Sequence, residues 1–479
     1  MKSLNRMLLL LFVAACSPAE QPQPEAAPAV DEGGWVQGAM ATAANPHAVE
    51  AAIEILEKGG HAVDAAIAAH AVLGLVEPQS SGIGGGGFML VYQRDTGELT
   101  FHDGRESAPA GATVDMFMRD GEVMGFVDAW QSGKAVGVPG AIALYKLAHD
   151  THGKLPWADV LEPAIRLATE GFEVSPRLAN YLPMMAERSR LDENPGTAEY
   201  FYPGGQPLQA GDLLKNPAYA NTLSRVAEEG TDAFYTGEIA IEIAAAAQAA
   251  PNPGSLTVED IANYRAITRE VICGPFRDMS ICTPSPPSSG GAQIMIAALY
   301  DHLAADSGSQ ADRIVAWVDA QRLAYADRDH YFGDPDEVDI PLEDLLNPEY
   351  LSHRATERFA PGATPTPGDP GLVLRGEPTA ALFSVDTTEE AAGTTHLSII
   401  DSDGNAVSMT ATVEAPFGTQ RWAAGFLLNN EMTDFAREVP ADGSRPANAI
   451  APNRRQRSSM SPSMIFDASG TLIMVTGSP

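Results

Sequence analysis

Basic side chains are scarce in this sequence, which holds 30 Lys and Arg residues against 63 Asp and Glu residues. The resulting formal charge of -33 at neutral pH repels phosphate backbones and anionic membrane surfaces. We therefore exclude nucleic-acid binding as the function of the chain. The acidic excess indicates a well-solvated surface and does not identify a substrate.

The apolar run near the start of the chain, Met7 to Val13, is too short to cross a bilayer. Lys2 and Arg6 precede the run, and small residues lead from it to Cys16. This pattern is typical of a lipoprotein signal peptide of residues 1–15, whose cleavage leaves Cys16 as the lipidated first residue. An ordinary secretory signal followed by a chance cysteine is the alternative. We expect a periplasmic protein that is lipid-anchored to a bacterial membrane.

Residues 16–34 are rich in Pro, Ala, Glu and Gln and have no apolar periodicity. Such a segment is expected to be a flexible tether between a membrane and a folded domain. Folding should start near Trp35. The 479 residues, 44% of them hydrophobic, provide ample material for a large core, but length alone leaves the number of domains open.

Cysteine is also rare, with three residues in the chain. Cys273 and Cys282 flank a short segment, residues 274–281, that can turn back as a hairpin. An oxidising compartment would permit a disulfide between them. Two small buried thiols are an equal alternative, because a sequence does not supply the Cα separation that a disulfide requires.

Helical patterns dominate the first part of the chain. A cap followed by proline at residues 45–46 predicts a helix that the glycines at 59–60 terminate. Residues 62–76 are almost uncharged and predict a helix that is buried on most sides. Further helices are expected between residues 139 and 250 and at residues 311–328. Between residues 354 and 390 the periodicity is lost, which predicts an exposed loop.

A glycine-rich segment, residues 82–87, satisfies the letters of the dinucleotide-binding pattern G-x-G-x-x-G. A nucleotide loop of that type follows a strand and opens a helix. Here a helix comes before the glycines and a strand, residues 88–93, comes after them. We therefore predict a close backbone crossing, where side chains would not fit, and reject nucleotide binding.

Two hairpins are predicted from alternating strand patterns. The first joins residues 88–93 to 98–102 and places Arg105 just beyond its end. The second joins residues 395–400 to 406–413 through a turn near Asp403. Hairpin arithmetic then sets Thr394 opposite Thr412, with Glu414 two residues further on the same face. Without regular strand-helix-strand alternation, layered α and β elements are favoured over a doubly wound fold.

Several motifs in this order resemble the γ-glutamyltransferase (γ-glutamyltranspeptidase) family. The most specific are Glu77-Pro78-Gln79-Ser80-Ser81-Gly82-Ile83-Gly84-Gly85-Gly86, Thr394-Thr395-His396 and Leu428-Asn429-Asn430-Glu431-Met432. The resemblance extends over nearly the whole chain after the tether. It implies an α+β fold, the αββα four-layer sandwich of N-terminal-nucleophile hydrolases.

The resemblance also implies a precursor that cuts itself between Gly393 and Thr394. Residues 35–393 would form a large subunit and residues 394–479 a small subunit within one domain. Thr394 would then be the nucleophile, because its new α-amine, with a pKa of about 7.7 to 8.0, can take the proton of its own hydroxyl. Thr412 would orient that hydroxyl. No cofactor and no metal are implied.

Substrate recognition in the family requires opposite charges for the two groups on a glutamyl α-carbon. By position in the matching motifs, Arg105, Ser458 and Ser459 would hold the α-carboxylate. Glu431 and Asp434 would hold the α-ammonium. The residue types suit these roles, because a guanidinium pairs with a carboxylate in a bidentate fork and two acids can flank an ammonium.

Three departures from the family pattern stand out. Glu414 occupies the position where well-known members carry an Asn, which puts acyl-group selectivity in doubt. The segment between residues 434 and 458 is short for a full lid, which favours hydrolysis over transfer. The family continues beyond the strand-like run at residues 472–475 with a Gly-Gly pair for the oxyanion hole and the rest of the small subunit. We therefore expect the sequence to be a fragment of an active enzyme.

These observations predict an autoprocessing γ-glutamyl hydrolase or transferase that acts on glutathione and related γ-glutamyl amides. A γ-glutamyl-enzyme would be released by water or by an amino acid or peptide acceptor. One alternative is a glutaryl-type (cephalosporin) acylase of the same superfamily, against which Glu431 and Asp434 argue. The other is an unprocessed, inactive lipoprotein that only binds a ligand or partner.

Two further clusters are weaker candidates. His149, Asp150 and His152 have a spacing that matches no zinc motif on a helix, so we predict no metal there. Asp327, Asp329, Asp334 and Asp336 lack the glycine and the terminal glutamate of a calcium loop, and we predict a solvated turn.

Overall fold

The computed structural model describes residues 38–305, 307–357, 359–360, 362–384, 386, 388, 393–438, 440 and 443–478. The predicted signal peptide, Cys16 and the tether lie outside these residues. From Gly38 onward the chain forms one compact unit. Within the described ranges, no helix combines the length and the apolar composition that crossing a membrane requires.

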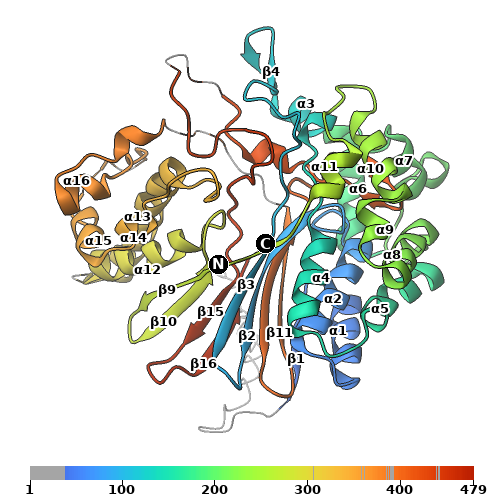
Figure 1. The fold of residues 1–479 in the computed structure, drawn as a ribbon, viewed down its shortest axis with the longest axis horizontal. Helices are drawn as coiled ribbons and strands as arrows, with labels where there is room; N and C mark the ends of the chain where they lie inside the picture. Colours follow the sequence, from blue (N-terminus) through green and yellow to red (C-terminus); the bar gives the residue numbers. More distant parts are fainter. Residues whose placement is uncertain are drawn as a thin grey trace, which may run out of the picture. The chain divides into compact units, whose positions relative to one another are not determined.

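A six-stranded antiparallel sheet forms the centre of this unit (Figure 1). Its order is β1 (Met40–Thr42), β11 (Thr394–Ile400), β12 (Ala406–Thr412), β2 (Gly86–Gln93), β3 (Glu98–Gly104) and β8 (Ile267–Arg269). Both predicted hairpins are therefore confirmed, and the later one lies between strands from the start of the chain. Thr394 pairs with Thr412, as the hairpin arithmetic predicts, and Thr412 pairs with Gly86 on its other side.

A second, four-stranded antiparallel sheet is stacked on the first. Its order is β16 (Leu472–Thr476), β15 (Ser463–Phe466), β10 (Met279–Pro284) and β9 (Val271–Phe276). Apolar side chains from both sheets, among them Phe88, Leu90 and Met464, form the core between them. Cys273 and Cys282 are paired across β9 and β10 and form a disulfide, so of the two alternatives the bridge is the one observed.

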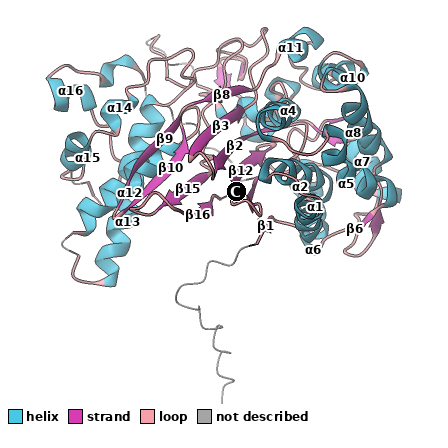
Figure 2. Cartoon of the chain, turned by 60° about the horizontal axis from the view of Figure 1, so that its bottom comes forward, coloured by secondary structure: helices cyan, strands magenta, loops and turns pink. Residues whose placement is uncertain are grey.

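Helices cover the outer faces of the two sheets (Figure 2). The six-stranded sheet packs on α1 (Pro46–Glu57), α2 (Ala62–Val76) and α4 (Ala141–His152), and α5 (Trp157–Glu170) packs on α2. The four-stranded sheet packs on α12 (Gly290–Ala304), which in turn contacts α13 (Gln310–Tyr331) and α15 (Pro348–Arg354). As predicted, α2 is buried on nearly every side, because it contacts helices as well as β11 and β12. The order of layers is helix, sheet, sheet, helix, which confirms the predicted αββα sandwich.

Further α-helices and three small two-stranded ribbons are present in the described residues. The helices are α3 (Phe126–Trp130), α6 (Pro176–Ser189), α7 (Pro195–Phe201), α8 (Pro217–Glu229), α9 (Asp232–Tyr235), α10 (Glu238–Gln248), α11 (Val258–Asn263), α14 (Leu342–Leu345) and α16 (Pro370–Arg375). Three small ribbons pair β4 (Met118–Arg119) with β5 (Glu122–Val123), β6 (Phe172–Glu173) with β7 (Leu213–Leu214), and β13 (Trp422–Ala423) with β14 (Phe426–Leu427).

The glycine-rich segment is a backbone crossing, as predicted. A Cβ on Gly84 would lie 2.0 Å from the carbonyl oxygen of Leu427, and one on Gly85 would lie 2.0 Å from that of Thr412. No side chain fits at such distances, since a real Cβ does not approach backbone oxygen so closely. The glycines thus let the start of β2 pass directly beside the end of β12.

The prediction of a solvated turn was wrong, and that of an exposed loop at residues 354–390 was confirmed in part. Asp327 is fully buried within α13 and pairs with Arg354 at 2.8 Å, and Asp334 is also buried, so neither belongs to a solvated turn. In the predicted exposed loop, Asp369 caps α16 by accepting a hydrogen bond from the amide of Leu372. The buried aspartates and this short helix were missed because the stabilising partner is not visible in a periodic pattern.

Candidate active site

Two threonine hydroxyls meet where β11 begins and β12 ends. The Oγ1 atom of Thr394 donates a hydrogen bond to Oγ1 of Thr412 at 3.4 Å. The Thr412 hydroxyl donates in turn to the carbonyl oxygen of Gly393 at 3.3 Å and accepts from the amide of Glu414 at 2.7 Å. Thr412 therefore contacts both the hydroxyl of Thr394 and the carbonyl of the peptide bond that precedes it.

The sheet register determines what lies beside this pair. Directly opposed residues of neighbouring strands point to the same face, so Thr394, Thr412 and the position of Gly86 share one face. A Cβ on Gly86 would lie 2.8 Å from the carboxyl carbon of Glu106. Glycine at position 86 thus leaves space for the carboxyl group of Glu106 next to the threonine pair.

Arg105 lies at the centre of the charged part of the site. Its side chain is 1% exposed and donates to Glu431 at 2.5 Å and to Asp434 at 2.6 Å. It also donates to the backbone carbonyls of Gln456 and Arg457, at 3.3 and 3.1 Å. Burial alone lowers the pKa of Arg105, but the two carboxylates outweigh it, so the pKa lies above its ordinary value and the guanidinium stays charged.

Glu106 is a buried acid that the sequence-based roles did not include. Its two carboxyl oxygens have no hydrogen-bond partner among the described residues, and the nearest guanidinium nitrogen of Arg105 is 3.8 Å away. Burial raises the pKa of Glu106 to about 8, even though Arg105 acts in the opposite direction. Burial likewise raises the pKa of Glu431. The only sequence signal for Glu106 was its position directly after Arg105.

Glu414 joins the same acidic group. It is 4% exposed, and its charge is one of the influences that raise the pKa of Glu431. Its carboxylate accepts a hydrogen bond from the side-chain amide of Asn430. The backbone of Glu414 has a φ of 76°, a left-handed conformation that is uncommon for a residue with a side chain. The structure thus brings together Arg105, Glu414, Glu431 and Asp434.

The two predicted serines are placed differently from each other. Ser458 is buried, and its hydroxyl accepts from the amide of Met460 at 3.2 Å. Ser459 is exposed, and its hydroxyl accepts from Arg328 at 3.2 Å. Arg328 is a second buried guanidinium, which also donates to the hydroxyl of Ser289 at 2.8 Å. Sequence reasoning missed Arg328 because it lies on α13, far from the serines in the chain.

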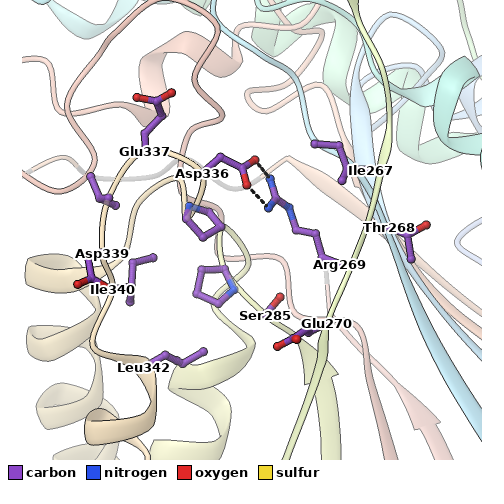
Figure 3. Close-up of a pocket in the computed structure, with 13 residues that line it drawn as sticks. Ile267, Thr268, Arg269, Glu270, Ser285, Asp336, Glu337, Asp339, Ile340 and Leu342 are labelled. Carbon is purple, nitrogen blue, oxygen red and sulfur yellow. Dashed lines mark hydrogen bonds and ion pairs between the residues drawn. The ribbon is translucent and has the colours of Figure 1, made fainter.

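A cavity of about 700 Å³ lies near this site but is lined by none of the predicted site residues (Figure 3). Arg269 lies at its edge and pairs with Asp336 at 2.6 Å and with Asp103 at 2.7 Å. Asp103 accepts from the backbone amide of Arg105 at 2.8 Å. Asp103 therefore connects Arg269, at the edge of the cavity, to the backbone of Arg105.

Comparisons with known proteins agree with this geometry. The sequence profile of the gamma-glutamyltranspeptidase family matches residues 48–479. A glutathione hydrolase proenzyme from Bacillus subtilis is 36% identical over 99% of this chain and 81% of its own length, and one from Escherichia coli is 37% identical over 92% and 75%. The crystal structure of a cephalosporin acylase from Bacillus halodurans superposes with a TM-score of 0.78 at 27% identity, covering 96% of this chain and 80% of that one.

Replacing Glu106 by Gln should flatten the dependence of stability on pH. The folded protein keeps the Glu106 proton up to about pH 8, whereas a glutamate in the unfolded chain releases its proton at about pH 4.3. Between these values the folded state binds more protons, so the free energy of unfolding falls as pH rises, by up to about 1.4 kcal/mol per pH unit. Gln cannot titrate and removes this contribution.

Denaturant titrations of the wild type and of E106Q at pH 5 and pH 7.5 measure the effect. Glu98, an exposed acid at the other end of β3, provides the matched control E98Q, which should keep the wild-type slope. Equal pH slopes for E106Q and the wild type would show that Glu106 is already ionised in the folded protein.

Proposed function

We propose that this chain, which belongs to the gamma-glutamyltranspeptidase family, cuts itself before Thr394 and then hydrolyses or transfers γ-glutamyl groups. The observation that carries the proposal is the hydroxyl of Thr412, bonded at once to the Thr394 hydroxyl and to the Gly393 carbonyl. The relatives named as proenzymes support the self-cleavage, and those named as glutathione hydrolases support the substrate class.

Self-cleavage follows from the threonine geometry. The hydroxyl oxygen of Thr394 attacks the carbonyl carbon of Gly393 while the hydroxyl of Thr412 donates to the carbonyl oxygen, which becomes negatively charged. The C–N bond breaks, the threonine nitrogen takes the proton, and an ester joins Gly393 to the Thr394 side chain. Water then hydrolyses the ester, which leaves a carboxyl on Gly393 and a free amine on Thr394.

Turnover uses the new amine as the base. It takes the proton of the Thr394 hydroxyl as the oxygen attacks the γ-amide carbonyl, and it returns the proton to the departing amine. The γ-glutamyl group is then bound to Thr394 as an ester. Water releases glutamate, whereas an amino acid or peptide with a free amine takes the group by transfer. None of these steps requires a cofactor.

The charged part of the site favours a zwitterionic acyl donor. Without substrate, Arg105 is paired directly with Glu431 and Asp434. A γ-glutamyl group exchanges these contacts, because its carboxylate pairs with Arg105, assisted by Ser458 and Ser459, and its ammonium pairs with the acids, including Glu414. Every buried charge keeps a partner in this exchange, which matters because an unpaired buried charge is strongly destabilising.

A glutaryl-type acylase is the second candidate, and the similarity to the Bacillus halodurans cephalosporin acylase favours it. A glutaryl group carries the carboxylate but no ammonium. Its binding would take Arg105 from the fully buried Glu431 without supplying an ammonium in its place. The acidic cluster therefore supports the γ-glutamyl substrate over the glutaryl one.

We further propose that the mature protein is held by a lipid on Cys16 in the bacterial periplasm. The basic residues, apolar run and small residues before Cys16 support this location. The disulfide between Cys273 and Cys282 is in keeping with an oxidising compartment.

Replacement of Thr394 by Ala should abolish self-cleavage and give one band on a denaturing gel, whereas the wild type gives two. Thr412→Ala should slow cleavage by about 100-fold or more, because it removes a donor to the Gly393 oxygen, and Thr412→Ser should retain most of the rate. Gel time courses and the N-terminal sequence of the smaller fragment provide the measurement. If T412A forms the fragment that starts with Thr394 as fast as the wild type does, Thr412 does not have the proposed role.

Two anilide substrates separate the two enzyme candidates. With γ-glutamyl p-nitroanilide, Glu431→Gln should lower kcat/KM by about 10- to 100-fold, since it removes a charge-assisted contact to the ammonium. With glutaryl p-nitroanilide the same variant should raise kcat/KM, because it removes the buried charge that glutaryl binding separates from Arg105, whereas Arg105→Lys should lower kcat/KM for both substrates. Preference of the wild type for the glutaryl substrate would establish the acylase instead.

A single substitution tests the lipid anchor. Cys16→Ser should move the protein from the membrane fraction to the soluble periplasmic fraction and abolish labelling by radioactive palmitate. Cys273→Ser is the control and should leave both unchanged. A Cys16→Ser protein that has lost residues 1–15 and still sediments with membranes would show that another segment anchors it.

A further inference from the structure

One face of the hairpin formed by β11 and β12 is lined with polar side chains. On β11 these are Thr394, His396 and Ser398, and on β12 they are Ser408, Thr410 and Thr412. The opposite face carries Leu397, Ile399, Val407 and Met409, which pack into the core around α2. Stacked sheets are usually joined by apolar side chains, so the polar face toward β16 requires specific partners.

Those partners are the backbone of β16 and the ring of His396. Ser408 donates to the carbonyl oxygen of Thr476 at 2.9 Å, and Ser398 donates to that of Val475 at 3.4 Å. The two ring nitrogens of His396 contact the hydroxyls of Thr410 and Ser398, at 2.8 and 3.0 Å. This network connects the nucleophile's hairpin to the last residues of β16.

Gly477, directly after β16, packs against the ring of His396. A Cβ on Gly477 would lie 2.3 Å from both Cε1 and Nδ1 of the ring, so only glycine fits there while the ring keeps its position. His396 lies two residues from Thr394 on the same face, a distance of about 7 Å along the strand. The ring therefore sets how closely the backbone at the end of β16 approaches the nucleophile.

The ring is held in one orientation and without charge. Burial lowers the pKa of His396 to about 4, so the imidazole is neutral near neutral pH. A neutral imidazole has one N–H donor and one acceptor nitrogen, and the two neighbouring hydroxyls can supply the matching groups. No charged group is needed to keep the ring in place, and its orientation follows from these two contacts and from Gly477.

We propose that His396 is a positioning residue, whose neutral ring seats Gly477 and thereby holds the backbone at the end of β16 at a set distance from Thr394. This inference rests on the proposed function. Backbone N–H groups beside a nucleophile can stabilise the oxygen that becomes negative during acyl transfer. A displacement of about 1 Å at such a place can cost about 100-fold in rate.

The test is a double-mutant cycle of His396→Ala and Gly477→Ala, read by steady-state kinetics with γ-glutamyl p-nitroanilide. Each single variant should cut itself normally, because Thr412 and Gly393 are untouched, and should lose about 100-fold in kcat with little change in KM. In H396A/G477A the added methyl group meets no ring, so kcat should be no lower than in H396A. The inference would be overturned if the losses in kcat of the two single variants multiply in the double variant, or if only KM changes.

Thr395→Val is the matched control. Thr395 is the neighbouring residue and is more deeply buried on the opposite face, and its hydroxyl has no partner among the described side chains and backbone. T395V should keep the wild-type kcat. If H396A does not fold, His396→Asn replaces it in the cycle, since its shorter side chain also leaves space for a methyl group on residue 477.

Melting temperatures separate this inference from the proposed function. G477A should lower the melting temperature in the wild-type background and leave it unchanged in the H396A background. If the wild type neither cuts itself nor releases the dye, the proposed function is wrong, and the melting cycle alone decides whether His396 seats Gly477. Equal shifts in both backgrounds would show that it does not.

Discussion

The antiparallel register of β11 and β12 is the constraint on which the site depends. It places Thr394 opposite Thr412 and Thr412 opposite Gly86. A shift by one residue would turn both hydroxyls toward α2 and bring Leu397 and Met409 to the polar side. Because the core around α2 requires those apolar side chains, the free energy of the core also maintains the geometry of the nucleophile. Stability and chemistry are thus enforced by the same pairing.

A second constraint is electrostatic. One buried guanidinium, that of Arg105, lies among several acids, and burial raises the pKa of Glu106 and of Glu431. Without substrate the site therefore reduces its excess negative charge partly by keeping protons. A ligand ammonium can replace such a proton, whereas an acyl group without an ammonium cannot. The surplus of acid near the nucleophile is consistent with recognition of a cationic α-amino group next to a carboxylate.

Local patterns were sufficient for most of the fold. The helix at residues 62–76, the two hairpins and the pairing of Thr394 with Thr412 follow from periodicity and turn residues that lie close together in the chain. The burial of Asp327 and the contact of Arg328 with Ser459 do not follow from such local patterns, because each depends on a partner that only tertiary packing brings near. The site residues were predicted from a family resemblance, because a threonine in a strand is unremarkable by pattern alone.

The stacking of the two sheets explains why the site needs more than its reacting groups. An apolar interface would allow β16 to slide by small amounts at little cost, because dispersion contacts are not directional. Hydrogen bonds from Ser398 and Ser408 to carbonyls of β16 are directional, and the contact of His396 with Gly477 is a steric stop. These polar groups therefore fix the position of β16 on the six-stranded sheet, on the face of β11 where Thr394 lies. The apolar remainder of the interface supplies the stability that keeps the sheets together.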